Sequence, residues 1–128
     1  MRSPLARTMN MLKKDGWLVQ KVEQWNPFSK TLHDLYGTID AVAIKEGTLG
    51  VFGIQVTSGS NVSSRIQKSL KETRLKVWLS CGNSYEVQGW RKAKAKRGGK
   101  RVIYKLRRVK FTYDKRHDAV YYKEVEDE

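Results

Sequence analysis

The chain has 128 residues, and its 26 Lys and Arg against 13 Asp and Glu give a formal net charge of +13 at pH 7. This is the length of one domain, and a hydrophobic fraction of 39% argues against a disordered chain. No stretch approaches the roughly 20 apolar residues of a membrane span, and residues 1–15 lack the apolar run of a signal peptide. Nucleic acid is the commonest partner for such an excess of positive charge, ahead of an anionic membrane surface or an acidic protein.

A single cysteine, Cys81, rules out an intrachain disulfide. This cysteine usage fits a reducing cytoplasm, where we expect the protein to reside. With only two histidines in the chain, it also argues against a structural zinc site.

The first half of the chain is predicted to form one helix and three strands. Residues 3–15 form the helix, because their apolar side chains fall on one face at spacings of four and three. Strands follow at 17–25, 36–45 and 49–57, and a turn at residues 45–48 makes the last two a hairpin. The near-continuous apolar content of this hairpin indicates a central position in a sheet that is covered on both faces.

The second half is predicted to contain a long helix and a further hairpin. The helix spans residues 62–80, and its apolar phase breaks near 71–73, which is compatible with two shorter helices. Strands are expected at 84–90 and 101–113. The alternation of the latter slips at Arg107-Arg108, and a β-bulge there would restore one inward face.

The resulting order, α-β-β-β-α-β-β, predicts an α/β fold with a mixed central sheet flanked by helices. We expect residues 1–113 to form a single domain. A polar and acidic C-terminal tail, residues 114–128, is expected to be frayed.

Asp40 lies within an otherwise apolar predicted strand, where a buried carboxylate needs a cation, hydrogen-bond donors or solvent. Gln55 and Thr57 lie in the paired strand and share one face by its two-residue period. One face of the hairpin can therefore present Asp40, Gln55 and Thr57 together. Oxygen ligands of this kind hold hard divalent cations, which activate water and stabilise charge on a phosphate under attack.

The stretches Gly37-Thr-Ile-Asp40-Ala-Val-Ala and Gly53-Ile-Gln55-Val-Thr57 resemble the metal-binding hairpin of the PD-(D/E)XK, or restriction-endonuclease-like, nuclease superfamily. The longer run from Asp34 to Arg65 is similar to short phage and bacterial proteins described as Holliday-junction-resolvase-like. The resemblance covers roughly residues 5–90. It implies an αβββαβ core, Mg²⁺ or Mn²⁺ as cofactor, and a homodimer that acts on DNA in a bacterial or phage-infected cytoplasm.

Two positions depart from the superfamily pattern. Gln55 stands where an acidic ligand is usual, and Thr57 stands where a lysine is usual. The resemblance therefore requires replacements. Asp34 or Glu23 can supply the missing carboxylate, and Lys68 or Arg65, on the following helix, can supply the missing cation. On this basis Asp40, Gln55, Lys68 and Asp34 are the candidate catalytic residues, and Asp40, Gln55 and Glu23 are the candidate metal ligands.

A basic stretch holds most of the net charge of +13: residues 91–110 contain eleven Lys and Arg and no acidic residue. We expect residues 91–100 to form the flexible loop of the last hairpin and to follow a phosphate backbone without reading sequence. The candidate nucleic-acid contacts are Arg91, Lys92, Lys94, Lys96, Arg97, Lys100 and Arg101, with Arg65 on the preceding helix. Trp90, at the base of this loop, is expected to pack on the core.

Two functions follow from these patterns. The first is a metal-dependent nuclease that hydrolyses phosphodiesters in DNA, including branched or structured DNA, at a variant site. The alternative is a catalytically inactive module of the same fold that binds nucleic acid through the basic hairpin.

Overall fold

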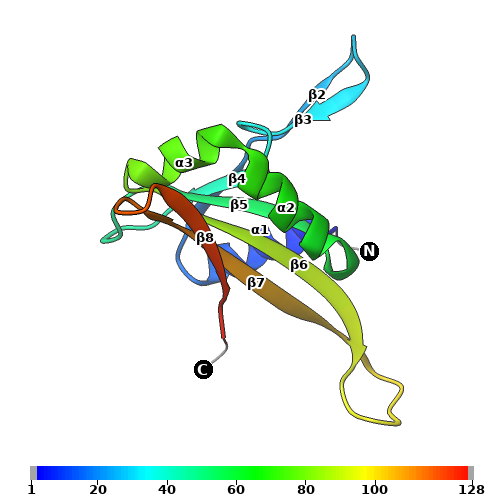
Figure 1. Ribbon diagram of the computed structural model, residues 1–128. Coiled ribbons are helices and arrows are strands. Elements are labelled where there is room, and N and C mark those ends of the chain that lie inside the picture. The colour runs from blue at the N-terminus through cyan, green and yellow to red at the C-terminus, as the bar shows by residue number, and fades with distance from the viewer. Residues whose placement is uncertain (1–2, 127–128) are drawn as a thin grey trace.

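A mixed six-stranded sheet organises the chain in the computed structural model, which describes residues 3–126 (Figure 1). The strand order across the sheet is β1-β4-β5-β6-β7-β8, and β5–β6 is the parallel pair among antiparallel ones. The prediction of an α/β fold with a mixed central sheet is confirmed. The strands are β1 (Leu18–Lys21), β4 (Ala41–Ile44), β5 (Phe52–Ser58), β6 (Ser84–Lys94), β7 (Val102–Asp114) and β8 (Ala119–Glu124).

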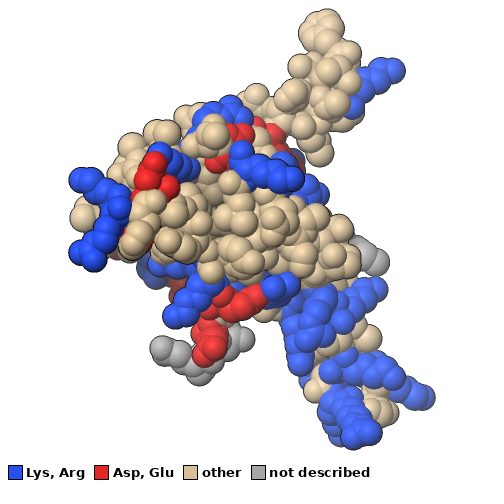
Figure 2. Space-filling model, in the orientation of Figure 1, with Lys and Arg blue, Asp and Glu red and all other residues tan. Residues whose placement is uncertain are grey.

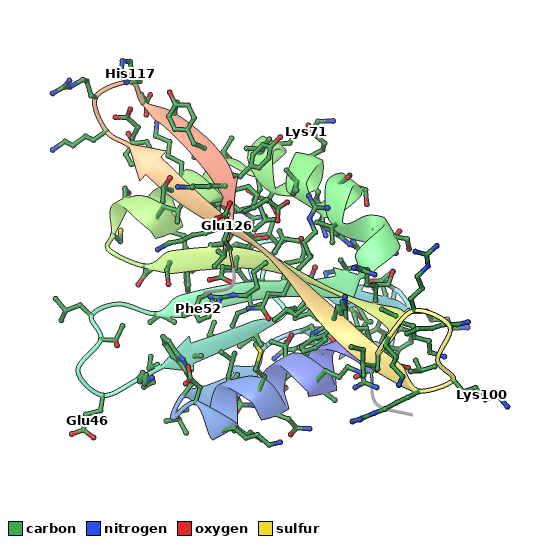
Figure 3. All side chains as sticks on the ribbon, turned by 90° about the horizontal axis from the view of Figure 1, so that it is seen from below. Glu46, Phe52, Lys71, Lys100, His117 and Glu126 are labelled. Carbon is green, nitrogen blue, oxygen red and sulfur yellow. The ribbon has the colours of Figure 1, made fainter. Side chains whose placement is uncertain are left out.

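Helices cover both faces of the sheet, with α1 (Pro4–Lys14) on one side and α2 (Val62–Lys71) and α3 (Thr73–Ser80) on the other (Figure 3). The predicted break in the long helix falls at Glu72, whose extended backbone ends α2 and whose carboxylate caps the backbone amide of Arg74 at the start of α3. Within residues 3–126, no helix is long and apolar enough to cross a membrane.

Each face of the sheet has its own hydrophobic core. Under α1, Leu12 packs with Val19, Phe52 and Ile54, and under α2 and α3 the larger cluster includes Tyr85 and Phe111. Gly89 brings α2 close to the sheet, because a β-carbon there would lie 2.2 Å from a methyl group of Val62. Helices thus cover a separate apolar core on each face, and polar side chains buried in either core need hydrogen-bond partners within the fold.

The predicted β-bulge at Arg107-Arg108 is wrong. The pairing of β6 with β7 runs without interruption from Tyr85–Phe111 to Lys94–Val102. The apolar residues of β7 change sides along the strand. Phe111 packs under α2 and α3, whereas Tyr104 lies on the α1 side. There the guanidinium carbon of Arg7 lies 3.3 Å from the centre of the Tyr104 ring. A two-sided sheet needs no bulge to bury both sets.

The predicted frayed tail from residue 114 is also wrong over its central part. Residues 119–124 form β8, which pairs with β7 from Val109–Glu124 to Asp114–Ala119. Tyr122 lies against Phe111 with ring centroids 5.9 Å apart, so β8 extends the core rather than trailing from it. The last two residues of the predicted tail, 127–128, lie outside the described residues.

The predicted strand at 17–25 is divided in two. β1 ends at Lys21, and β2 (Gln24–Asn26) turns away to pair with β3 (Thr31–His33) as a separate two-stranded sheet. The side-chain oxygen of Asn26 accepts hydrogen bonds from the backbone of Phe28 and Ser29, which fixes the turn between the two strands. This hairpin projects from the body of the protein (Figure 1).

A series of hydrogen bonds links polar side chains under α1. The indole nitrogen of Trp90 donates to the Thr8 hydroxyl, which donates to Gln88, and Gln88 donates to Glu86. Arg108 closes the series with two hydrogen bonds of 2.8 Å to the Glu86 carboxylate. Trp90 therefore packs against the fold, as the sequence predicts.

Candidate functional site

Asp40 immediately precedes β4 and lies beside the middle of β5. Ala41 pairs with Ile54, so the register places Asp40 opposite Gln55 on the face that α2 covers. Asp40 is 6% exposed and Gln55 is 2% exposed, and Thr57 on the same face is also buried. The predicted juxtaposition of these three residues on one face is present, and the Asp40 carboxylate accepts a hydrogen bond of 2.8 Å from the Val56 amide.

Two further carboxylates converge on Asp40. Glu23 comes immediately before β2 and Asp34 immediately after β3, so the small hairpin carries both of them to the start of β4. One carboxylate oxygen from each of Glu23, Asp34 and Asp40 lies within 4.8 Å of the others. We call these three residues the carboxylate cluster. Figure 2 shows acidic atoms, flanked by Lys and Arg, where the hairpin joins the body.

Burial, more than the neighbouring carboxylates, makes Asp40 a weak acid. Burial, opposed by the hydrogen bond from Val56 and assisted by a hydrogen bond with Asp34 and by the negative charges of Asp34 and Glu23, raises the pKa of Asp40 from 3.8 to about 8. A buried carboxyl group beside two others is stable in this position either with a proton or with a cation. A raised pKa of this origin is typical of functional sites.

Lysine side chains border the carboxylate cluster. The ammonium group of Lys68, on α2, lies 3.4 Å from a carboxylate oxygen of Asp34. Lys21, at the end of β1, lies 3.8 Å from Glu23. Lys68 is thus placed at the site, as the sequence expectation requires, and its side chain remains 42% exposed.

A neutral hydrogen-bond network lies behind the cluster and was missed by sequence reasoning. The Tyr85 hydroxyl shares a 2.7 Å hydrogen bond with Ser69 and lies 3.4 Å from the Gln55 carbonyl oxygen and 3.3 Å from the Thr38 carbonyl. Burial raises the pKa of Tyr85 well above its usual range, so its hydroxyl stays protonated. A tyrosine in an apolar alternation carries no sequence signal that distinguishes a site residue from a core residue.

The cluster fits a hard divalent cation in its chemistry and nearly in its size. Mg²⁺ binds carboxylate oxygens at about 2.0–2.1 Å, so two of its ligands can be up to about 4.2 Å apart. The 4.8 Å spread therefore exceeds this maximum by about 0.6 Å, so the side chains must draw together to hold the ion. The Gln55 carbonyl oxygen has two lone pairs and receives a single long hydrogen bond from Tyr85, so it retains capacity for a cation.

The predicted nucleic-acid contacts lie on the hairpin of β6 and β7. Figure 2 shows Lys and Arg covering its projecting end, and Lys100 stands at the tip in Figure 3. The predicted loop is shorter than expected, because β6 continues through residue 94 before the chain turns. All seven predicted hairpin residues are exposed: Arg91, Lys92, Lys94, Lys96, Arg97, Lys100 and Arg101.

Arg65 lies on α2, one turn before Lys68 and Ser69. Its backbone carbonyl accepts the Ser69 hydroxyl, while its Nε atom is buried and has no hydrogen-bond partner within residues 3–126. The Thr38 hydroxyl is the other buried side-chain group of this kind in the described chain. Unsatisfied polar groups are costly, and both occur in elements that border the cluster.

No protein-family model, no curated protein and no solved structure matches this chain in the comparisons made. The functional interpretation therefore depends on the site itself.

Proposed function

We propose that this protein is a nuclease that uses Mg²⁺ or Mn²⁺ to hydrolyse phosphodiester bonds in DNA. The observation that carries the proposal is the convergence of Glu23, Asp34 and Asp40 at the edge of a buried strand, with Lys68 beside them. Three carboxyl groups whose oxygens lie within 4.8 Å of one another repel one another when all are ionised, and a divalent cation would relieve that repulsion.

The order of the elements supports the proposal. The main sheet and its helices follow the order α1, then β1, β4 and β5, then α2 and α3, then β6, which is parallel to β5. This order resembles the αβββαβ core of the PD-(D/E)XK superfamily, with β4 and β5 as its metal-binding hairpin. In that resemblance Asp40 takes the position of the acidic metal ligand on the first strand of the β4–β5 hairpin. Asp34 and Glu23 supply the charge that Gln55 lacks.

The residues of the site would have separate roles in phosphodiester hydrolysis. A bound cation supplies Lewis acidity toward the phosphate and its attacking water. Asp40, Asp34 and Glu23 would hold the cation, and Gln55 would offer a neutral oxygen. Lys68, released from Asp34 by the cation, would then be free to neutralise charge on the phosphate, which is the task of the lysine absent at Thr57.

The basic hairpin would bind the DNA backbone away from the site. The seven predicted contact residues are all exposed and lie on β6 and the segment that follows it. Contacts of this type position DNA and make affinity strongly dependent on salt.

Cleavage of labelled duplex, single-stranded and four-way-junction DNA with Mg²⁺ or Mn²⁺ tests the proposal. We expect at least one substrate to be cleaved, and Asp40→Asn to abolish cleavage while sparing binding measured in EDTA. Glu46→Gln, in the exposed turn after β4, is the matched control and should cleave normally. Intact substrates under all these conditions would contradict nuclease activity.

The alternative is a module that binds DNA without cutting it. The specific observation in its favour is that Gln55 points its carbonyl oxygen toward Tyr85. This alternative predicts metal-independent binding that is lost when the charges of Lys94, Lys96 and Arg97 are removed together.

A further inference from the structure

The β2–β3 hairpin exposes apolar side chains that nothing in the described chain covers. Trp25 and Leu32 form a cross-strand pair, and each is 58% exposed. Phe28, in the turn between the strands, is 97% exposed. We call residues 24–33 the aromatic arm. A two-stranded hairpin is marginal by itself, and exposed apolar groups on it are typical of a contact surface.

The other face of the aromatic arm is polar. Gln24 pairs with His33, and Asn26 pairs with Thr31, so by the two-residue period these side chains lie opposite Trp25 and Leu32. A hollow of about 370 Å³ lies along the arm and is lined by Gln24, Trp25, Asn26, Pro27, Phe28 and His33. Aromatic surface next to amide and imidazole groups matches a nucleobase, which has an apolar ring face and hydrogen-bonding edges.

The aromatic arm begins and ends at the carboxylate cluster. Glu23 precedes Gln24, and Asp34 follows His33, so any ligand of the arm lies next to the proposed metal. Strands of three residues extend about 10 Å from this root, which corresponds to about three stacked nucleotides at 3.4 Å each.

The charge near the aromatic arm favours an anionic partner. The arm has no acidic residue between its two roots and carries Lys30 in its turn. Lys21 and Lys68 flank the roots, where each contacts one of the cluster carboxylates. An apolar peptide would bring no charge to match Lys30, whereas a single-stranded nucleic acid brings both bases and phosphates.

We propose that the aromatic arm stacks on unpaired nucleobases next to the scissile phosphate, which makes a fork, flap or junction the preferred substrate class. This inference rests on the proposed function, because it assumes that the phosphate at the carboxylate cluster belongs to nucleic acid. In fully paired duplex the bases are stacked on one another, so the arm has no exposed ring face to contact and contributes no selectivity there.

Binding in EDTA to two fluorescent DNAs tests the inference: a fork that carries 2-aminopurine at the unpaired base next to the branch, and a blunt duplex of equal length. We expect Trp25→Ala and Phe28→Ala each to weaken fork binding about 5- to 100-fold, and to leave duplex binding within about twofold. Binding of the unaltered protein should change the 2-aminopurine emission, and Phe28→Ala should remove that change.

Leu49→Ala is the matched control. Leu49 is also 97% exposed and lies in the turn after β4, at the opposite end of that strand from Asp40. It should bind both DNAs normally. The three substitutions are at exposed positions, so loss of folding is not expected to confuse the comparison.

Equal affinity of the arm variants and the unaltered protein for the fork would overturn the inference, as would an equal loss on fork and duplex. A dimer in sedimentation that Phe28→Ala converts to monomer, without any change in fork binding, would show that a second copy of this chain covers the arm and would also overturn it. Because binding is measured without metal, these outcomes are separate from nuclease activity. A cleaving protein with unaffected arm variants refutes only the arm, and a non-cleaving protein with fork-selective arm effects refutes only catalysis.

Discussion

Replacing Asp40 by Asn should make the metal-free protein more stable at neutral pH. The Asn side chain has the shape of a protonated Asp: its oxygen can accept the Val56 amide hydrogen bond, and its amide group can donate to Asp34. The substitution therefore keeps the local hydrogen bonds while removing the need to hold a proton on a buried carboxyl group.

The magnitude follows from the raised pKa of Asp40. Below pH 3.8 this group is protonated in both the folded and the unfolded chain, so it does not change the free energy of unfolding. As the pH rises from 3.8 toward about 8, the unfolded chain loses the proton while the folded chain keeps it, so stability is lost across that window. At 1.36 kcal/mol per unit, the roughly three units up to pH 7 amount to about 4 kcal/mol as an upper limit. We expect a gain of about 1–4 kcal/mol from Asp40→Asn at pH 7.

Urea unfolding in EDTA at pH 4 and pH 7 measures the effect. The two proteins should have nearly equal free energies of unfolding at pH 4, and the variant should be the more stable at pH 7. Asp114→Asn is the control, because a hydrogen bond with His117 lowers the pKa of Asp114 and no gain is expected there. A variant that is no more stable than the unaltered protein at pH 7 would refute the reasoning, since Asp40 would then be ionised and compensated in the metal-free fold.

The remaining predictions concern the cation, the network behind it and the basic hairpin. Mn²⁺ in excess should raise the thermal unfolding midpoint of the unaltered protein but not that of Asp40→Asn, because a ligand stabilises only the fold that binds it; equal shifts would place the ion elsewhere. Tyr85→Phe should lower the free energy of unfolding by about 1 kcal/mol through loss of its hydrogen bond with Ser69, and an unchanged urea midpoint would contradict that bond. Neutralising Lys94, Lys96 and Arg97 to Gln should weaken duplex binding and flatten its dependence on salt, whereas the same change at Lys115 and Arg116, in the turn before β8, should leave both unaltered.

Local patterns predicted much of the fold. The phase break near residue 72 anticipated two helices, and the period of the strands anticipated that Asp40 and Gln55 share a face. Both inferences depend only on helix and strand geometry, which a single sequence carries. The same geometry failed at Arg107-Arg108, because the alternation assumes one buried face, whereas β7 packs against helices on both sides of the sheet.

The carboxylate cluster could be anticipated only as a set of options. Glu23 and Asp34 are eleven positions apart, and their convergence depends on the turn at Asn26 that folds the segment between them into a hairpin. An Asn-Pro pair, here Asn26-Pro27, indicates that a strand ends, but it does not specify that the chain then folds back to form a hairpin. The exposure of Trp25 and Phe28 could not be predicted for the same reason, since an aromatic residue in or next to a predicted strand is ordinarily assigned to the core.

Anomalous X-ray scattering from crystals grown with Mn²⁺ tests the central claim most directly. We predict one strong peak at about 2.1–2.3 Å from carboxylate oxygens of Asp40 and of Asp34 or Glu23, and no peak at that position in Asp40→Asn crystals. A fully ordered carboxylate cluster without a peak, at Mn²⁺ concentrations that saturate any effect on the protein's stability, would contradict a metal centre and leave Asp40 as a buried, protonated member of the core.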